Sequence, residues 1–201
     1  MKNYLALDTT NADMTVVLKY NGKYFKYKET RSSLKHGSVF MTATESLLTE
    51  SGADVKDMDF FACATGAGSF TGIRIGISAI KAFCFAENKP FLAVTSFDTI
   101  AYNDVSGKQL AVIDAKHGAY YVCGYDNGKV VIPPAYMTKE ELLAVKGYKI
   151  KSFEDLGLGE EKVDACQGFI NAIEEKENEL SFDTSELKPE YVRKSQAEEG
   201  R

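Results

Sequence analysis

Residues 58–86 read MDFFACATGAGSFTGIRIGISAIKAFCFA, and this stretch decides the fold. Its first part, from Met58 to Ala64, is a short, mostly apolar run of the kind expected for a buried strand. A glycine-rich turn, GAGSFTG at 66–72, follows this run, and a helical pattern then extends to about Ala86. The stretch therefore predicts a strand that enters a helix through a tight turn.

The glycine-rich turn has two interpretations. Glycines let the backbone turn sharply and approach a ligand closely, and a helix N-terminus favours an anion. Ser69 and Thr71 would add hydroxyl groups to such a phosphate site. The turn is not a Walker A loop, because no Gly-Lys-Ser/Thr follows it. The alternative is a capped structural turn with no ligand, and both interpretations stay open on the sequence.

The residues before this unit predict a three-stranded antiparallel meander, with strands at 3–8, 15–20 and 23–30. Asn21-Gly22 is a hairpin signal between the second and third strands. Asp8-Thr9-Thr10 follows the first strand. These side chains could hold a phosphate-bound metal ion, or they could form Asx and hydroxyl turn contacts.

Two helices are predicted to have unusual apolar surfaces. In the helix at 34–50, Leu34, Met41 and Leu48 form one stripe, and a second stripe lies roughly opposite. Two stripes suggest that one packs on the protein's own sheet and the other on something else. The helix at 69–86 is apolar almost all round, which suggests either a central core helix or a helix covered by a partner.

The second half begins as a weak repeat of the first. The pattern resets around 104–107, and the strand Gln109 to Asp114 resembles the strand Leu5 to Asp8. Asp114 is thus the counterpart of Asp8. Further strands at 118–125 and 129–132 and a short helix at 138–145, capped by Thr138, complete the prediction.

The composition excludes several classes of protein. With 44% hydrophobic and 26% charged residues, the chain is an ordinary globular protein and not a disordered one. Its 24 basic and 29 acidic residues give a net charge of −5, which disfavours direct binding of a nucleic-acid backbone. The start, MKNYLALDTT, is no secretory signal, and no apolar run of about 18 residues occurs. A cytoplasmic protein is the expectation.

The reactive side chains form no recognisable catalytic motif. Cysteines at 63, 84, 123 and 166 show no CxxC spacing and are predicted to be reduced core thiols. His36 and His117 lack a second histidine at HxxxH spacing, so no metal site is predicted. Neither a Ser-His-Asp triad nor a GxSxG nucleophile elbow can be identified.

In their order along the chain, these motifs resemble the bacterial TsaB family, also called YeaZ. The resemblance rests on Asp8-Thr9-Thr10 after the first strand, on His36 at the start of a helix, and on GAGSFTGIRIG at 66–76. Further matches are Ala93-Val94-Thr95-Ser96-Phe97, Asp114-Ala115-Lys116-His117-Gly118 before a tyrosine-rich strand, and Pro189-Glu190-Tyr191-Val192-Arg193. These landmarks span nearly the whole chain.

The resemblance implies an α/β fold of the actin-like ATPase type (ASKHA, ribonuclease H-like) with two related domains. The first would occupy residues 1–103, and a smaller, degenerate second domain would occupy 104–201. It also implies a role in making N6-threonylcarbamoyladenosine at position 37 of tRNA. In that role the chain would be a non-catalytic, cytoplasmic subunit that supports a TsaD-like transferase, which a TsaE-like ATPase joins. The chain would form a homodimer in isolation, contact tRNA only through the complex, and bind no membrane.

The resemblance places the working surface on the N-terminal helices. The expected partner or dimer interface comprises His36, Val39, Phe40, Ala43, Leu47, Ile73, Gly76, Ile77 and Ile80. A vestigial nucleotide or phosphate cleft is expected at Asp8, Thr9, Thr10, Gly66, Gly68, Ser69 and Asp114. No catalytic residue, metal or required cofactor is implied, and weak ATP or ADP binding at that cleft stays open.

Two other functions remain to be weighed. The chain could be a small ATPase or phosphotransferase that acts through Asp8, Thr10, the 66–72 loop and Asp114. Turnover of Mg-ATP that Asp8→Ala abolishes would favour it. A protease, suggested by an older glycoprotease label of the family, has no supporting metal site or triad.

Overall fold

The computed structural model describes residues 2–30 and 36–193, and for residues 36–38 the backbone only. By their contacts these residues form two compact units. The first contains the chain up to Val94 together with Ile173–Pro189, and the second contains Thr95–Ala172 with the chain from Glu190. The division differs from the expected one at 103/104, because helix α3 (Ser96–Ala101) joins the second unit and a C-terminal segment returns to the first.

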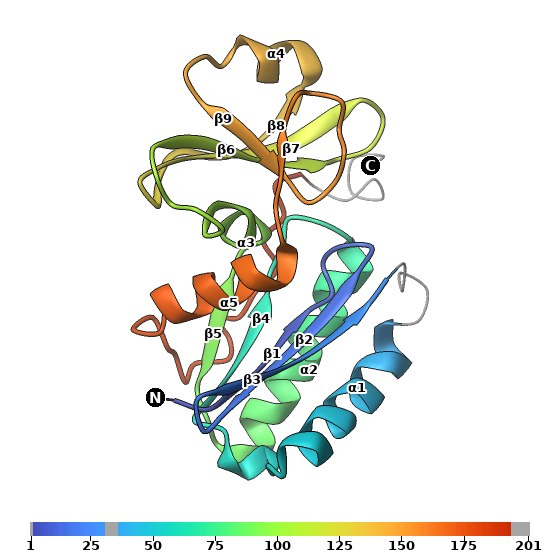
Figure 1. The fold of residues 1–201 in the computed structure, drawn as a ribbon. Coiled ribbons are helices and arrows are strands. Elements are labelled where there is room, and N and C mark those ends of the chain that lie inside the picture. The colour runs from blue at the N-terminus through green and yellow to red at the C-terminus, as the bar shows by residue number, and fades with distance from the viewer. Residues whose placement is uncertain (1, 31–35, 194–201) are drawn as a thin grey trace. The chain divides into compact units, whose positions relative to one another are not determined.

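The first unit is built on a five-stranded sheet in the order β3-β2-β1-β4-β5 (Figure 1). The predicted meander is confirmed, since β1, β2 and β3 pair antiparallel, while β4 and β5 run parallel to β1. The strands are β1 (Tyr4–Asp8), β2 (Met14–Tyr20), β3 (Lys23–Glu29), β4 (Phe60–Ala64) and β5 (Phe91–Val94).

Helices α1 (His36–Ser51) and α2 (Phe70–Glu87) cover one face of this sheet and lie side by side (Figure 1). A short 3-10 helix, η1 (Val55–Asp57), precedes β4. The register puts Leu5, Leu18 and Phe61 on one face of neighbouring strands, where they pack with buried side chains of both helices. The predicted strand–turn–helix unit is therefore β4, the 65–69 loop and α2.

The segment Ile173–Pro189 is held to the rest of the first unit by charged and backbone contacts. Lys19 Nζ lies 2.5 Å from Glu174 Oε1, and Lys2 Nζ lies 3.2 Å from Glu177 Oε1. Ser181 forms a backbone bridge with Phe91 at the start of β5. Leu187 is completely buried in the core under α1 and α2. These long-range contacts explain why the segment belongs to the first unit.

The second unit repeats the strand order of the first. Its sheet has the order β10-β9-β6-β7-β8, which corresponds strand for strand to β5-β4-β1-β2-β3, with the same antiparallel and parallel pairings. Helix α4 (Lys139–Ala144) takes the position of α1 along the chain, and the 153–160 loop takes that of α2. The strands are β6 (Lys108–Asp114), β7 (Ala119–Asp126), β8 (Lys129–Thr138), β9 (Lys149–Ser152) and β10 (Glu161–Lys162).

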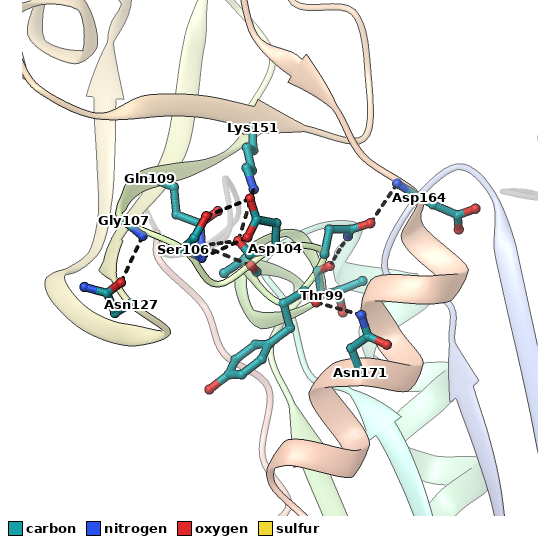
Figure 2. Close-up of polar contacts among 12 residues, drawn as sticks. Thr99, Asp104, Ser106, Gly107, Gln109, Asn127, Lys151, Asp164 and Asn171 are labelled. Atoms are coloured by element: carbon teal, nitrogen blue, oxygen red, sulfur yellow. Dashed lines mark hydrogen bonds and ion pairs between the residues drawn. The ribbon is translucent and has the colours of Figure 1, made fainter.

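Side-chain hydrogen bonds fix the segment between α3 and β6 in the second unit (Figure 2). The buried Lys151 ammonium of β9 donates to the Asp104 carbonyl at 3.1 Å, and Gln109 Nε2 of β6 donates to the same carbonyl at 2.9 Å. From helix α5 (Ala165–Glu175), Asn171 Nδ2 donates to the Tyr102 carbonyl at 2.8 Å. Because buried polar groups are costly unless paired, this network ties α3, β6, β9 and α5 together.

Candidate functional site

The Asp8 turn at the end of β1 is closed by its own hydrogen bonds. Asp8 Oδ1 accepts from the Thr10 backbone N–H at 2.8 Å and from the Thr10 hydroxyl at 2.7 Å. Asp8, Thr9 and Thr10 are all buried. The geometry is that of an Asx turn, which was one of the two interpretations of this motif.

Burial changes the electrostatics of this carboxyl group. Desolvation raises the pKa of Asp8, although the two hydrogen bonds from Thr10 act in the opposite direction. A raised carboxyl pKa is common at catalytic sites, but it also follows from burial alone. The pKa direction therefore does not by itself distinguish an active residue from a structural one.

The glycines of the 66–76 motif approach the chain's own backbone. A Cβ atom at Gly68 would lie 2.3 Å from the Thr10 carbonyl oxygen, and one at Gly72 would lie 1.9 Å from the Thr9 carbonyl oxygen. The Ser69 N–H donates to the Thr10 carbonyl at 2.7 Å. The turn after β1 therefore fills the space that these glycines open.

The first residues of the glycine-rich turn also have structural roles. Gly66 and Gly68 have φ values of 119° and 153°, which side-chain-bearing residues rarely adopt. The Ser69 hydroxyl accepts the Gly72 N–H at 3.2 Å and so caps α2. The structure thus brings Asp8, Thr9, Thr10, Gly66, Gly68 and Ser69 together within the first unit.

Asp114 of the second unit forms the same kind of turn as Asp8. Its Oδ1 atom accepts from the Lys116 backbone N–H at 2.8 Å, and its Oδ2 atom lies 2.6 Å from Lys116 Nζ. Partial burial acts to raise the pKa of Asp114, but the contacts with Lys116 and the nearby His117 outweigh it and lower the pKa. Each half of the repeat therefore ends its first strand in an aspartate-closed turn.

Most of the expected interface residues lie in the core of the first unit. Ala43, Leu47, Ile73, Ile77 and Ile80 are at most 6% exposed and belong to the core cluster. For these five side chains the prediction is wrong, because they pack against the protein's own sheet. Gly76 is also buried, facing Thr9, and the His36 side chain lies outside the described part of the structure. Val39 and Phe40 are half-buried.

Two pockets are lined by α1 and α2 together, and we call the pair the α1–α2 groove. In the first pocket, Phe40 of α1 lines the space with Ile75 and Ala79 of α2. In the second, Met41 and Leu48 of α1 do so with Phe83 of α2. Arg74, Ser78 and Glu45 give it a polar rim. Met41 is 52% exposed, and Phe85, farther along α2, is 90% exposed. Of the predicted interface residues, Phe40 contributes to this groove.

The two apolar stripes on α1 exist, but their roles differ from those expected. Ala43 and Leu47, assigned to the partner surface, face the core, whereas Met41 and Leu48 of the other stripe line the groove. On α2, Arg74 and Ser78 are exposed and lie next to the groove residues Ile75 and Ala79. The spacing located both faces of each helix without indicating which one the sheet covers.

The remaining features that could indicate a function are metal-binding clusters, cysteines and membrane-spanning helices. Among residues 2–30 and 36–193, no cluster of histidine, cysteine, aspartate or glutamate is arranged to hold a metal ion. None of the four cysteines forms a disulfide, and burial raises the pKa of the Cys84 thiol to about 11. None of the described helices is both long and apolar enough to cross a membrane.

Comparison with known proteins identifies the family. A protein-family model described as "TsaD: tRNA N6-adenosine threonylcarbamoyltransferase" matches residues 30–188, which is most of the chain. The chain therefore belongs to this family. Within it, the resemblance is to TsaB, or YeaZ.

Two curated TsaB proteins carry this resemblance. The "tRNA threonylcarbamoyladenosine biosynthesis protein TsaB" of Bacillus subtilis is 27% identical over 96% of this chain and 95% of its own length. The protein of the same name from Escherichia coli is 30% identical over 60% of this chain and 54% of its own length.

A solved structure shows the same fold. The structure titled "YeaZ from Pseudomonas aeruginosa" superposes with a TM-score of 0.79, at 23% identity, and covers 95% of this chain and 100% of that one. Together with the repeated strand order of the two units, this likeness confirms the predicted actin-like, ribonuclease H-like α/β fold.

Proposed function

We propose that this chain is a non-catalytic subunit in the biosynthesis of N6-threonylcarbamoyladenosine in tRNA, and that its α1–α2 groove docks a TsaD-like transferase. The names of the TsaB relatives support the pathway. The observation that carries the docking role is the groove itself. Its apolar lining is only partly covered, on two helices whose other residues, such as Leu47 and Ile73, are buried in the core.

The chemistry of the groove favours a protein partner with an apolar helical face. Side chains such as Ile75, Met41 and Phe83 offer apolar area, and exposed apolar patches with a polar rim mark interaction sites. A helix of the partner could lie between α1 and α2 with its apolar residues in the groove. A transferase that shares the family's fold would bring related helices to such a contact, and so would a second copy of this chain in isolation.

The packing of the glycine-rich turn supports a non-catalytic role. Gly68 and Gly72 make room for the Thr10 and Thr9 carbonyl oxygens, which would repel a phosphate. In a phosphate-binding loop, glycines instead let backbone N–H groups approach the anion. Under this proposal a TsaE-like ATPase joins the complex in the cytoplasm, and tRNA is contacted through the complex.

The first experiment measures association. The purified chain is titrated with the TsaD-type transferase of the same organism, and its self-association is followed by sedimentation velocity. We expect a stable heterocomplex, and we expect the transferase to convert any homodimer into that complex. A folded chain that binds neither the transferase nor itself at micromolar concentration would refute the docking role.

The Asp8→Asn variant serves two tests: the effect of Asp8 burial on stability, and the alternative function, an ATPase that acts through Asp8. Because the folded protein binds the Asp8 proton more tightly than the unfolded chain does, this group adds stability as pH falls through its raised pKa toward the ordinary value of 3.8. Asp8→Asn should remove that pH dependence, because the amide keeps an oxygen acceptor for Thr10 but does not titrate. Urea unfolding between about pH 4 and pH 7 measures this effect.

Asp114→Asn is the matched control, because the pKa of Asp114 is lowered and its contribution to stability is instead lost as pH falls. Mg-ATP turnover by the wild-type chain that Asp8→Asn abolishes would favour the ATPase over the subunit.

A further inference from the structure

Thr9 makes the closest contacts between the β1–β2 turn and helix α2. Its hydroxyl donates to the Gly72 carbonyl oxygen at 2.7 Å, and its side chain is completely buried. Gly72 lies at the start of α2, and Gly76 lies one helical turn farther on, so both glycines face the β1–β2 turn. The contact therefore fixes the first two turns of this helix.

The absence of side chains at two α2 positions is what allows this contact. A Cβ atom at Gly72 would lie 1.9 Å from the Thr9 carbonyl oxygen, and a Cβ atom at Gly76 would lie 2.7 Å from Thr9 Oγ1. Both distances are shorter than van der Waals contact. A side chain at Gly72 would push α2 away from the Thr9 backbone, and one at Gly76 would displace the Thr9 hydroxyl that holds α2. The helix sits where it does because Thr9 fits against these two glycines.

The same part of α2 also lines the α1–α2 groove. Thr71, Arg74, Ile75, Ser78 and Ala79 line its first part, opposite Phe40 of α1. These residues alternate along α2 with the glycines that contact Thr9. Any shift of the helix away from Thr9 would therefore carry the groove residues with it and change their spacing to α1.

We infer that Thr9 is a positioning residue for the docking surface, and that the Asp8-Thr9-Thr10 motif serves the chain by setting the place of α2. Asp8 supports this role, because its carboxylate holds the Thr10 amide and hydroxyl and so shapes the turn that carries Thr9. This inference rests on the proposed function of the groove.

The test is a double-mutant cycle between Thr9 and Gly76. Thr9→Ala removes the hydroxyl that holds Gly72, and Gly76→Ala forces the Thr9 hydroxyl out of its place. We expect each single variant to weaken transferase binding at least about fivefold, equivalent to about 1 kcal/mol. The double variant should recover most of the affinity, because the new methyl group occupies the space that the hydroxyl leaves.

Two further variants separate positioning from stability. Thr9→Ser keeps the hydroxyl and should bind like the wild type. Thr99→Ala, in the second unit, also removes a buried hydroxyl that bonds to a backbone carbonyl. We expect it to lower the unfolding midpoint and leave transferase affinity unchanged. Reduced affinity in Thr99→Ala equal to that in Thr9→Ala would mean that general destabilisation explains the loss, and would overturn the inference.

A second readout needs no partner. Amide hydrogen exchange of residues 71–79 should be faster in Thr9→Ala than in the wild type and should return toward the wild-type rate in the double variant. Single variants that keep wild-type exchange and affinity would overturn the positioning role while leaving the docking role intact. A wild-type chain that binds no partner would instead refute the proposed function, and the exchange data would still report on Thr9.

Discussion

Ile75→Asp is expected to abolish or strongly weaken association with the transferase while the chain stays folded. Ile75 is half-buried in the α1–α2 groove, opposite Phe40. In a complex its side chain would be desolvated, and a carboxylate there would lose its hydration without gaining a partner. The expected loss is that of an interface hot spot, about 2 kcal/mol or more, or roughly 30-fold in Kd.

Calorimetric titration of the transferase measures this loss, and circular dichroism checks the fold. Val131→Asp is the control, because Val131 is a β-branched apolar residue like Ile75 that is 49% exposed but belongs to the second unit. It should bind like the wild type. A folded Ile75→Asp variant with wild-type affinity would show that the partner does not use this groove.

Ile77→Asp, only two residues farther along α2, should unfold the protein. Ile77 is 6% exposed and packs in the core under α1 and α2. Burying an unpaired carboxylate there combines the cost of a buried charge with the loss of apolar contacts, at about 4 kcal/mol or more. That is a large fraction of the about 5–15 kcal/mol that stabilises a typical domain.

Thermal unfolding and far-ultraviolet circular dichroism measure the effect. The conservative change Ile77→Val should cost only about 0.5–1.5 kcal/mol, because it removes one methylene and adds no charge. If Ile77→Asp kept the wild-type midpoint and lost only partner binding, Ile77 would face the partner, and the assignment of the α2 faces would be reversed.

The sequence predicted the helices and strands around the candidate site more accurately than it predicted which face of each helix is buried. The strand 58–64, the turn 66–72 and the helix to about residue 86 correspond to β4, the loop and α2, since an apolar strand and an almost wholly apolar helix leave clear patterns. Strands β9 (Lys149–Ser152) and β10 (Glu161–Lys162) were missed. They are short and polar, and pairing with neighbouring strands makes them strands.

The glycine-rich turn shows a different limit. Its glycines predicted that the backbone closely approaches another group, and in the structure it closely approaches the Thr9 and Thr10 carbonyl oxygens. A ligand phosphate and a neighbouring carbonyl place the same demand on the residue, namely the absence of a Cβ atom. The motif alone therefore left both interpretations open, and only the contacts with Thr9 and Thr10 showed which group fills the space.

The sequence by itself determined the repeat, because each half carries its own local signals. An apolar strand ends at Asp8 and another at Asp114, each aspartate closes a turn by bonding to the backbone two residues on, and hairpins follow both. Such contacts are made within a few residues and need no tertiary context. The class of fold was instead implied by the resemblance of motifs, spanning nearly the whole chain, to the TsaB family.

Only the tertiary structure decided which side chains can meet a partner. On α1 and α2 the buried and exposed stripes are both apolar, so the hydrophobic pattern cannot rank them. Contact with the sheet determines which face is buried, because the strand register places Leu5, Leu18 and Phe61 beneath one face of the two helices. Ile73 and Ile77 are buried on that face. Phe40 and Ile75 stay only half-buried and line the groove.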